Sequence, residues 1–384
     1  MSGRAAFILL LVELACLPAS AKEPRQMRES RSDFIGAVGC KSSSCHGGAG
    51  PKRSQYITWS QHDFHTKAYA VLINSRSTRI AETLGFPEAQ SSARCTVCHS
   101  PLQSVASSRL SRTAHPDEGV SCESCHGAAG GWLRGHTRAD WTYRTRVAAG
   151  MRDLRDLYVR ANACVACHQN LAPELLSAGH PDLFFELDGQ SVAEPKHWRD
   201  EEPWSGLRQW LTGQAVALRE MSWALAKNPP ADELSITRWN ALAWLCATAT
   251  ATGNIPSPIS PPTATPDLSD FTRAQNEADA LARRAATANW NETSARTLLA
   301  ALASLDEEFA DKKLAPNLLA QRAKRLVLAL DRLTSALNQE AGVPLKAEAE
   351  MNQLFQDVNA LYSFDATGFA GHLQNLRAAL PPSR

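Results

Sequence analysis

The second half of the chain is dominated by apolar residues that recur every three or four positions, which is the spacing of an amphipathic helix. One helix is predicted over 203–226, a second over 232–249 and another over 315–337. The short connection between the first two predicts that they pack antiparallel. The apolar stripes consist of Leu207, Trp210, Leu211, Leu218, Met221 and Leu225, then Trp239, Leu242 and Cys246, then Leu319, Leu326, Leu330, Leu333 and Leu337. We therefore expect residues 201–384 to form a helical bundle domain.

Two further signals refine this bundle. The proline-rich stretch 254–267 cannot be helical and predicts a linker or a strap. Asp270 and Asn291 precede helical patterns and are predicted to cap them. Cys246 lies on an apolar helical face, so we interpret it as a buried structural thiol. His372 is most simply a surface or capping residue.

The first half shows no long helical period and is rich in glycine, serine and arginine, but it contains four cysteine pairs. Each pair ends in a histidine: CKSSSCH at 40–46, CTVCH at 95–99, CESCH at 122–126 and CVACH at 164–168. Histidine is only 11 of 384 residues, so its presence after every pair is not a coincidence. A plain disulfide framework would have no use for these histidines.

The spacing fits covalently attached haem. Two cysteines three positions apart on a helical turn point the same way and reach the two vinyl groups of one porphyrin edge, and the next histidine reaches the iron. In the first motif the extra residues are expected to bulge outward. The attachment residues are Cys40, Cys45, Cys95, Cys98, Cys122, Cys125, Cys164 and Cys167, and the proximal ligands are His46, His99, His126 and His168. We therefore predict four haem c groups and an irregular, haem-packed domain over 22–200, so that the chain is all-α.

Two alternatives stay open from the residues alone. The first motif is also compatible with a Cys40–Cys45 disulfide that leaves His46 idle. The other three motifs are also compatible with zinc, which prefers the same ligand types. Predicted export, the fourfold repetition and the surplus of histidines favour haem. The histidines beyond the proximal ones are His62, His65, His115, His136, His180, His197 and His372.

Two segments resemble a known family. GVSCESCHGAAGGWLRGH at 119–136 and WSQHDFHTKAYAVL at 59–72 are similar to the tetrahaem cytochromes of the cytochrome c-554 type, and the resemblance spans residues 36–185. It implies that His65 and His136 are distal ligands and that His180 serves the last haem. The longer first motif and the second domain depart from the smaller family members.

The resemblance also bears on catalysis, because the family leaves the haem of its second motif five-coordinate. An open iron binds small ligands, whereas an iron with two histidines only passes electrons. His115 and His62 have no clear counterpart in the family and either could cap that iron; we take His115 as the candidate ligand. His197 stands at the exit of the haem region, as a ligand, as a lid or without a role.

These patterns predict an electron carrier between a redox donor protein and an acceptor protein. The alternative is a reductase of a nitrogen or sulfur oxide at one open haem, so the question of enzyme activity stays open and no catalytic residue is named. The bundle would cover a haem edge, form an oligomer, dock a partner or anchor the haem domain in a larger complex. The formal net charge is +1, with a mildly basic first half and a mildly acidic second half, and neither half has the clustered basic face that nucleic-acid binding needs.

Residues 1–21 are predicted to be a signal peptide. Arg4 precedes the apolar stretch AAFILLLVELACL, and small residues lead to a cleavage site after Ala21. A membrane anchor is disfavoured because Glu13 interrupts the short apolar run, and Glu13 also argues against a lipid-anchored Cys16. No later segment is apolar enough to cross a bilayer. We therefore expect a periplasmic mature chain without a transmembrane segment.

Overall fold

Helices form all the regular structure of the described residues, which confirms the predicted all-α class. The computed structural model describes residues 33–198, 202–227, 232–252, 255, 257–311, 313–342, 344–359 and 364–381. The predicted signal peptide lies outside the described residues. The α-helices are α1 Gln55–His62, α2 Ser75–Thr83, α3 Ala93–His99, α4 Cys122–His126, α5 Tyr143–Ala148, α6 Leu157–His168, α7 Pro173–Ser177, α8 Leu187–Ala193, α9 Ser205–Lys227, α10 Glu233–Ala251, α11 Leu268–Ala285, α12 Glu292–Ala303, α13 Asp306–Ala310, α14 Pro316–Glu340, α15 Glu348–Asn359 and α16 Ala366–Ala379. Short 3₁₀ turns are η1 Ala37–Cys40, η2 Phe64–Lys67, η3 Ala70–Ile73, η4 Ala89–Ser91, η5 Pro101–Ser104 and η6 Ser107–Arg109.

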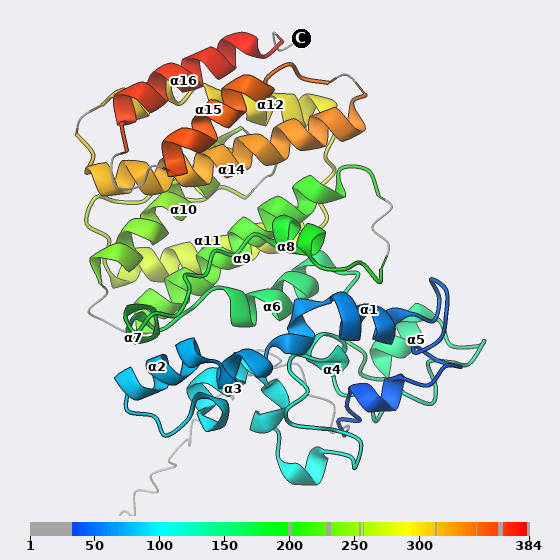
Figure 1. Cartoon of the computed structure of the whole chain (residues 1–384). Coiled ribbons are helices and arrows are strands. Elements are labelled where there is room, and N and C mark those ends of the chain that lie inside the picture. The colour runs from blue at the N-terminus through cyan, green and yellow to red at the C-terminus, as the bar shows by residue number, and fades with distance from the viewer. Residues whose placement is uncertain are drawn as a thin grey trace, which may run out of the picture.

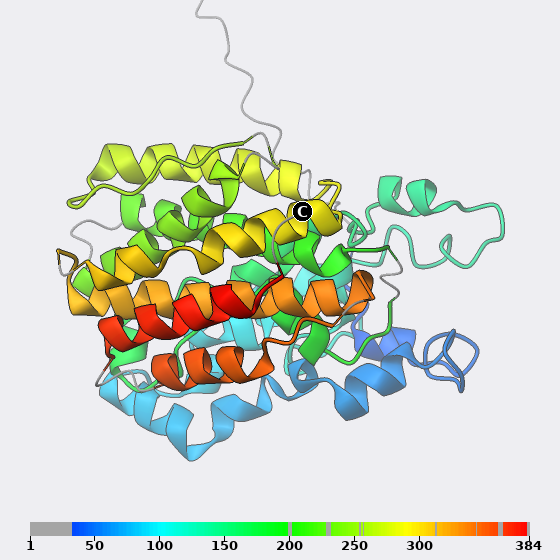
Figure 2. The same ribbon diagram turned by 90° about the horizontal axis from the view of Figure 1, so that it is seen from above.

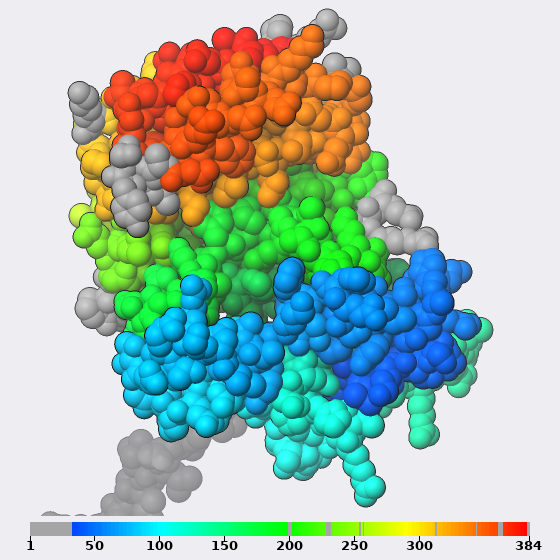
Figure 3. All heavy atoms as spheres, viewed as in Figure 1, coloured from blue at the N-terminus to red at the C-terminus, as the bar shows by residue number. Residues whose placement is uncertain are grey.

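The helices are arranged in layers (Figure 1). The short helices of the N-terminal half form one layer, α9, α10 and α11 lie above it, and α12 and α14–α16 form the outermost layer. The view from above shows α14 and α16 running side by side across the bundle (Figure 2), in agreement with their contact. The space-filling view shows the N-terminal layer pressed against α9 and its neighbours (Figure 3).

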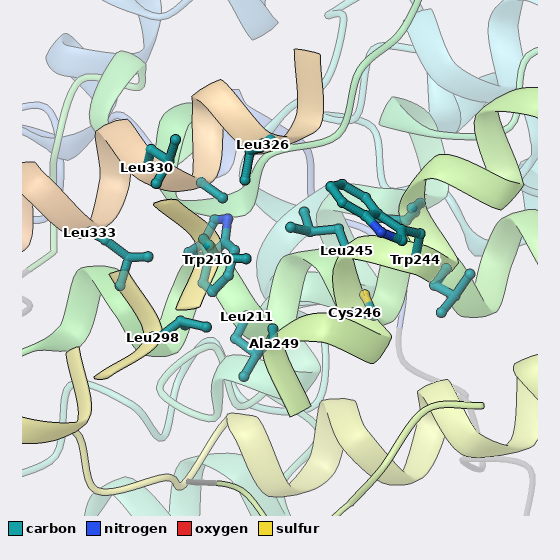
Figure 4. Packing of buried hydrophobic residues seen from close by; sticks show 14 of the residues in the cluster. Trp210, Leu211, Trp244, Leu245, Cys246, Ala249, Leu298, Leu326, Leu330 and Leu333 are labelled. Atoms are coloured by element: carbon teal, nitrogen blue, oxygen red, sulfur yellow. The ribbon is translucent and has the colours of Figure 1, made fainter. Parts of the chain in front are cut away.

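One continuous apolar core holds the bundle together. Figure 4 shows Trp210 of α9 beside Leu326 and Leu330 of α14, and Leu211 of α9 beside Ala249 of α10. Every residue of the predicted stripes is buried, and Cys246 is fully buried as predicted. The same core includes α6, which carries the fourth cysteine motif, because Ala161 and Val165 belong to it. The helix that carries the last motif therefore packs within the core of the bundle.

The N-terminal layer, in contrast, has little apolar core of its own. Among its described residues a small cluster forms around Leu72, Ala81 and Ala89, and Cys95 packs against it. The layer contains many residues but few contacts between apolar side chains. Groups other than apolar side chains must therefore fill its interior. A small apolar core of this kind is what the sequence predicts for a region packed around haem groups.

The helix signals near the proline-rich stretch need one correction. Asn291 caps α12 as predicted, but Asp267 rather than Asp270 caps α11. Asp270 is the third residue of that helix, and its side chain completes a capping box by binding the backbone of Asp267. The described residues between α10 and α11 are not helical as far as Asp267, and Ile255 and Ile259 among them are buried.

Within the described part of the chain, no helix is both long and apolar enough to cross a membrane.

Candidate haem-binding site

In three of the four motifs, the histidine is the last residue of a helix. The last residues of α3, α4 and α6 are His99, His126 and His168. Cysteines three positions apart therefore lie on one side of each helix. In the first motif η1 ends at Cys40 and the extra residues form a turn that returns to the same place, because the His46 amide donates to the Cys40 carbonyl.

All eight motif cysteines are free thiols in the structure, Cys40 and Cys45 included. Two thiol pairs connect different motifs. A hydrogen bond with Cys167 lowers the pKa of Cys98 to about 7, and Cys122 in the same way lowers the pKa of Cys40. The first motif is therefore adjacent to the third, and the second to the fourth. The third and fourth are also neighbours, because α4 contacts α6.

Each motif histidine faces a second histidine from elsewhere in the chain. The distances between ring centroids are 6.1 Å for His46 and His136, 6.0 Å for His168 and His65, 6.2 Å for His99 and His180, and 6.3 Å for His126 and His197. The planes of the first pair are 19° apart, and those of the others are 64° to 87° apart. The four imidazole pairs thus have nearly the same distance between ring centroids, and each pair joins segments that are far apart in the sequence.

Hydrogen bonds fix several of these rings through Nδ1. His99 Nδ1 bonds to the Ala68 carbonyl at 2.9 Å, and His180 Nδ1 to the Pro181 carbonyl at 2.7 Å. A ring held at Nδ1 has Nε2 left for a metal ion, which is the usual arrangement of metal-binding histidines. The other Nδ1 contacts are His46 to Gln55, His136 to Leu133 and His65 to Asp63.

Burial favours the neutral form of His99, His126 and His168. It lowers the pKa of His126 to about 4, with nearby charged histidines and Arg152 adding to the effect, and it also lowers the pKa of His99 and His168. Neutral imidazole is the form that ligates metals. His65 differs, because its hydrogen bond to Asp63 raises its pKa.

Buried polar contacts hold the short helix α4, which is too short to be stable alone. The buried Glu123 carboxylate accepts backbone N–H groups of Ile35, Gly36 and Ala129 at 2.6–3.0 Å. The Arg152 guanidinium donates to two carbonyls of α4 at 2.6 and 2.9 Å. The glutamate between the cysteines of the third motif therefore connects this motif to the start of the described chain.

The residues before the third motif connect it to the loop of His65. The Val120 amide donates to the His65 carbonyl at 3.0 Å, and Trp59 Nε1 donates to the Val120 carbonyl at 3.0 Å. Gly119 adopts a φ of 77°, and a Cβ at this position would lie 2.7 Å from the His65 carbonyl oxygen. Only glycine fits both the conformation and the close approach.

We expect Gly119→Ala to lower the free energy of unfolding of the haem-loaded protein by about 2–4 kcal/mol, through backbone strain and the clash with the His65 loop. Denaturant titration measures this. Gly85→Ala is the matched control, because Gly85 has a φ of 70° but no atom within 4 Å of the added Cβ; it is expected to lose about 1 kcal/mol. Equal losses in the two variants would show that the close approach to His65 is unimportant.

One segment of this region matches a known family. Residues 39–127 match the family model for cytochrome c554 and c-prime. These residues form a cytochrome c554/c-prime domain. The family comprises multihaem c-type cytochromes that bind haem c and act in electron transfer, typically outside the cytoplasm. No curated protein and no solved structure matches the chain.

The c554 domain contains the first three motifs and His65, whereas the fourth motif and the other facing histidines follow it. The structure places His65 and His136, both predicted as distal ligands, opposite motif histidines. The resemblance assigns His180 to the last haem, but its ring lies opposite His99 of the second motif. The place opposite the last motif is taken by His65.

The structure also shows where the remaining candidate histidines lie, namely His115, His62 and His197. His115, the candidate to cap the second motif, is exposed and belongs to none of the four pairs, and neither does His62. His197, whose role the sequence left open, faces His126. The residues around His197 do not indicate this pairing in the sequence, because its partner belongs to a distant motif.

Proposed function

We propose that this protein is a tetrahaem cytochrome c whose irons each have two histidine ligands, and that it transfers electrons between redox proteins outside the cytoplasm. The four imidazole pairs carry this proposal. Two metal–imidazole bonds of about 2 Å, with roughly 1 Å from each nitrogen to its ring centre, add up to the observed spacing of 6.0–6.3 Å. The donor set therefore fits one haem iron between the rings of each pair.

In this proposal the chain supplies the attachment points and both axial ligands. When bound, each haem supplies a one-electron iron couple, whose potential depends on axial ligands, hydrogen bonds and burial. The cysteine pairs fix the porphyrin edges, the motif histidines are the proximal ligands, and His136, His180, His197 and His65 are the distal ligands of the first to fourth motifs. Nδ1 hydrogen bonds hold several of these rings in position.

The contacts between motifs support a spatial order in which the four haem attachment sites follow one another. The first motif neighbours the third, the third neighbours the fourth, and the fourth neighbours the second. We infer that electrons move along a chain of sites in the order first, third, fourth and second. The two ends of this order are where a donor and an acceptor protein would dock.

The rival function, reduction of a small nitrogen or sulfur oxide, needs an iron with an open face. The resemblance suggests the second motif for this role. However, the ring of His180 lies opposite that of His99, with 6.2 Å between the ring centroids. With His180 in that place, the geometry favours a carrier over a reductase.

Two measurements on the purified holoprotein test the proposed function. Its intact mass should exceed that of the polypeptide by four haem groups, and reductive titration should take up four electrons per chain. Replacing both cysteines of one motif by alanine should remove one haem and one electron. A wild-type mass with no added haem, or with fewer than four, would refute the tetrahaem proposal.

A further inference from the structure

The segment 180–197, which we call the distal strap, supplies two of the facing histidines from its two ends. His180 faces His99 of the second motif and His197 faces His126 of the third. The middle of the strap is α8, a helix of seven residues. A helix this short is not stable alone, so the elements against which the strap packs must fix its position.

The first part of the strap is clamped by α10 and α14. Arg238 of α10 donates two hydrogen bonds, of 3.1 and 2.6 Å, to the carboxylate of Asp182, two residues after His180. The Arg325 guanidinium of α14 lies 3.9 Å from the ring centroid of Phe184. A bidentate arginine–carboxylate pair defines orientation as well as distance. The start of the strap is thus set by two helices of the bundle.

Buried charges fix the start of α8. Asp188 and Glu186 are 6% and 9% exposed. Arg332 of α14 places Nε 2.5 Å from the Asp188 carboxylate, and Arg325 places a guanidinium nitrogen 3.7 Å from Glu186. Burial raises the pKa of both carboxyl groups. Because a buried charge without its partner is strongly unfavourable, the strap is held where the arginines of α14 can reach it.

Close packing against α9 completes the attachment. A Cβ at Gly213 would lie 2.8 Å from the Leu187 Cβ, so glycine lets α8 approach α9 closely. Leu187 and Phe185 are fully buried in the same apolar core as the bundle helices. Figure 1 shows α8 lying against α9, in agreement with their contact.

We propose that the C-terminal bundle is the support that positions two distal ligands, His180 and His197, through the distal strap, with Arg332 and Arg238 as positioning residues. This inference rests on the proposed function, in which each iron has two histidine ligands. The bundle therefore determines whether the irons at the second and third motifs are closed or open to external ligands. Nothing in the c554 domain itself, which ends at residue 127, supplies these two ligands.

The test measures carbon monoxide bound per chain by dithionite-reduced holoprotein, together with the fraction of high-spin haem in the oxidised protein. Wild type should bind none and should contain four low-spin haems. Arg332→Met should bind up to two equivalents, because loss of the Asp188 pair frees the strap, and Arg332→Lys should restore most of the wild-type behaviour. Arg238→Ala should open the second-motif site and bind up to one equivalent.

Arg322→Met is the matched control. Arg322 lies on the same helix and is also ion-paired, but its partners are Glu308 and Asn240 within the bundle. This variant should lose thermal stability without binding carbon monoxide, which separates positioning of the ligands from general support of the fold. If Arg332→Met does not accumulate as holoprotein, Arg238→Ala, whose ion pair is partly exposed, decides by the same measurement.

The outcomes separate the two proposals. If wild type has four low-spin haems and neither Arg332→Met nor Arg238→Ala gains high-spin haem or carbon monoxide binding, the positioning role is refuted while the proposed function stands. If Arg322→Met opens haems as much as Arg332→Met, the effect is one of general stability and the positioning role is again refuted. Carbon monoxide binding or high-spin haem in wild type itself would instead refute the proposed function.

Discussion

Replacing His180 by alanine is expected to convert one of the four haems from low-spin to high-spin and to create one carbon monoxide binding site per chain. His180 lies opposite His99, so its removal leaves the second-motif iron with a single protein ligand. An iron with an open face binds small ligands. Absorption and electron paramagnetic resonance spectra of the oxidised protein measure the change.

His115→Ala is the control for this prediction, because sequence reasoning favoured His115 as the cap of the same iron. His115 is exposed and outside the four pairs, so its loss should leave all four haems low-spin. A high-spin signal in His115→Ala together with an unchanged spectrum in His180→Ala would assign the second-motif ligand to His115. It would also overturn the pairing of His180 with His99.

Replacing Glu123 by alanine is expected to lower the free energy of unfolding by about 3–5 kcal/mol. The Glu123 carboxylate is 2% exposed and accepts the backbone N–H groups of Ile35, Gly36 and Ala129. Truncation leaves these donors without partners, and each buried donor without a partner costs roughly 1–3 kcal/mol. Denaturant unfolding of the holoprotein measures the loss.

Two variants calibrate the Glu123 result. Glu118 binds a single backbone N–H group, that of Ala37, so Glu118→Ala should lose about 1–2 kcal/mol. Glu82 lies exposed on α2, and Glu82→Ala should stay within about 0.5 kcal/mol of wild type. If Glu123→Ala were no more destabilising than Glu82→Ala, the described link between the third motif and residues 35–36 would be wrong.

The bundle was readable from sequence because its signals are local. A stripe such as Leu207, Leu211 and Leu218 repeats within one helix and identifies the buried face without knowledge of its neighbours. The capping residue of α11 was misplaced because Asp267 and Asp270 both suit an N-terminus, and the capping box uses both.

The four cysteine–histidine motifs were also readable from the sequence, because each cysteine pair and its histidine lie within a few residues. Which histidine faces which motif was not readable in the same way, because each pair joins distant segments; the family resemblance named His65 and His136 as distal ligands but placed His180 at the last motif. His180 and His197 are set by the distal strap, whose acidic residues Glu186 and Asp188 look like solvent-exposed positions in the sequence. Their burial depends on arginines of α14, more than a hundred residues later. No periodicity within the strap carries that information.

Near-infrared magnetic circular dichroism of the oxidised wild-type protein tests the central claim most directly, because its charge-transfer band reports the axial ligands of each low-spin ferric haem. The account predicts an intensity equal to four bis-histidine haems per chain and no high-spin band. An intensity for three or fewer bis-histidine haems, accompanied by a high-spin band, would contradict the four histidine pairs.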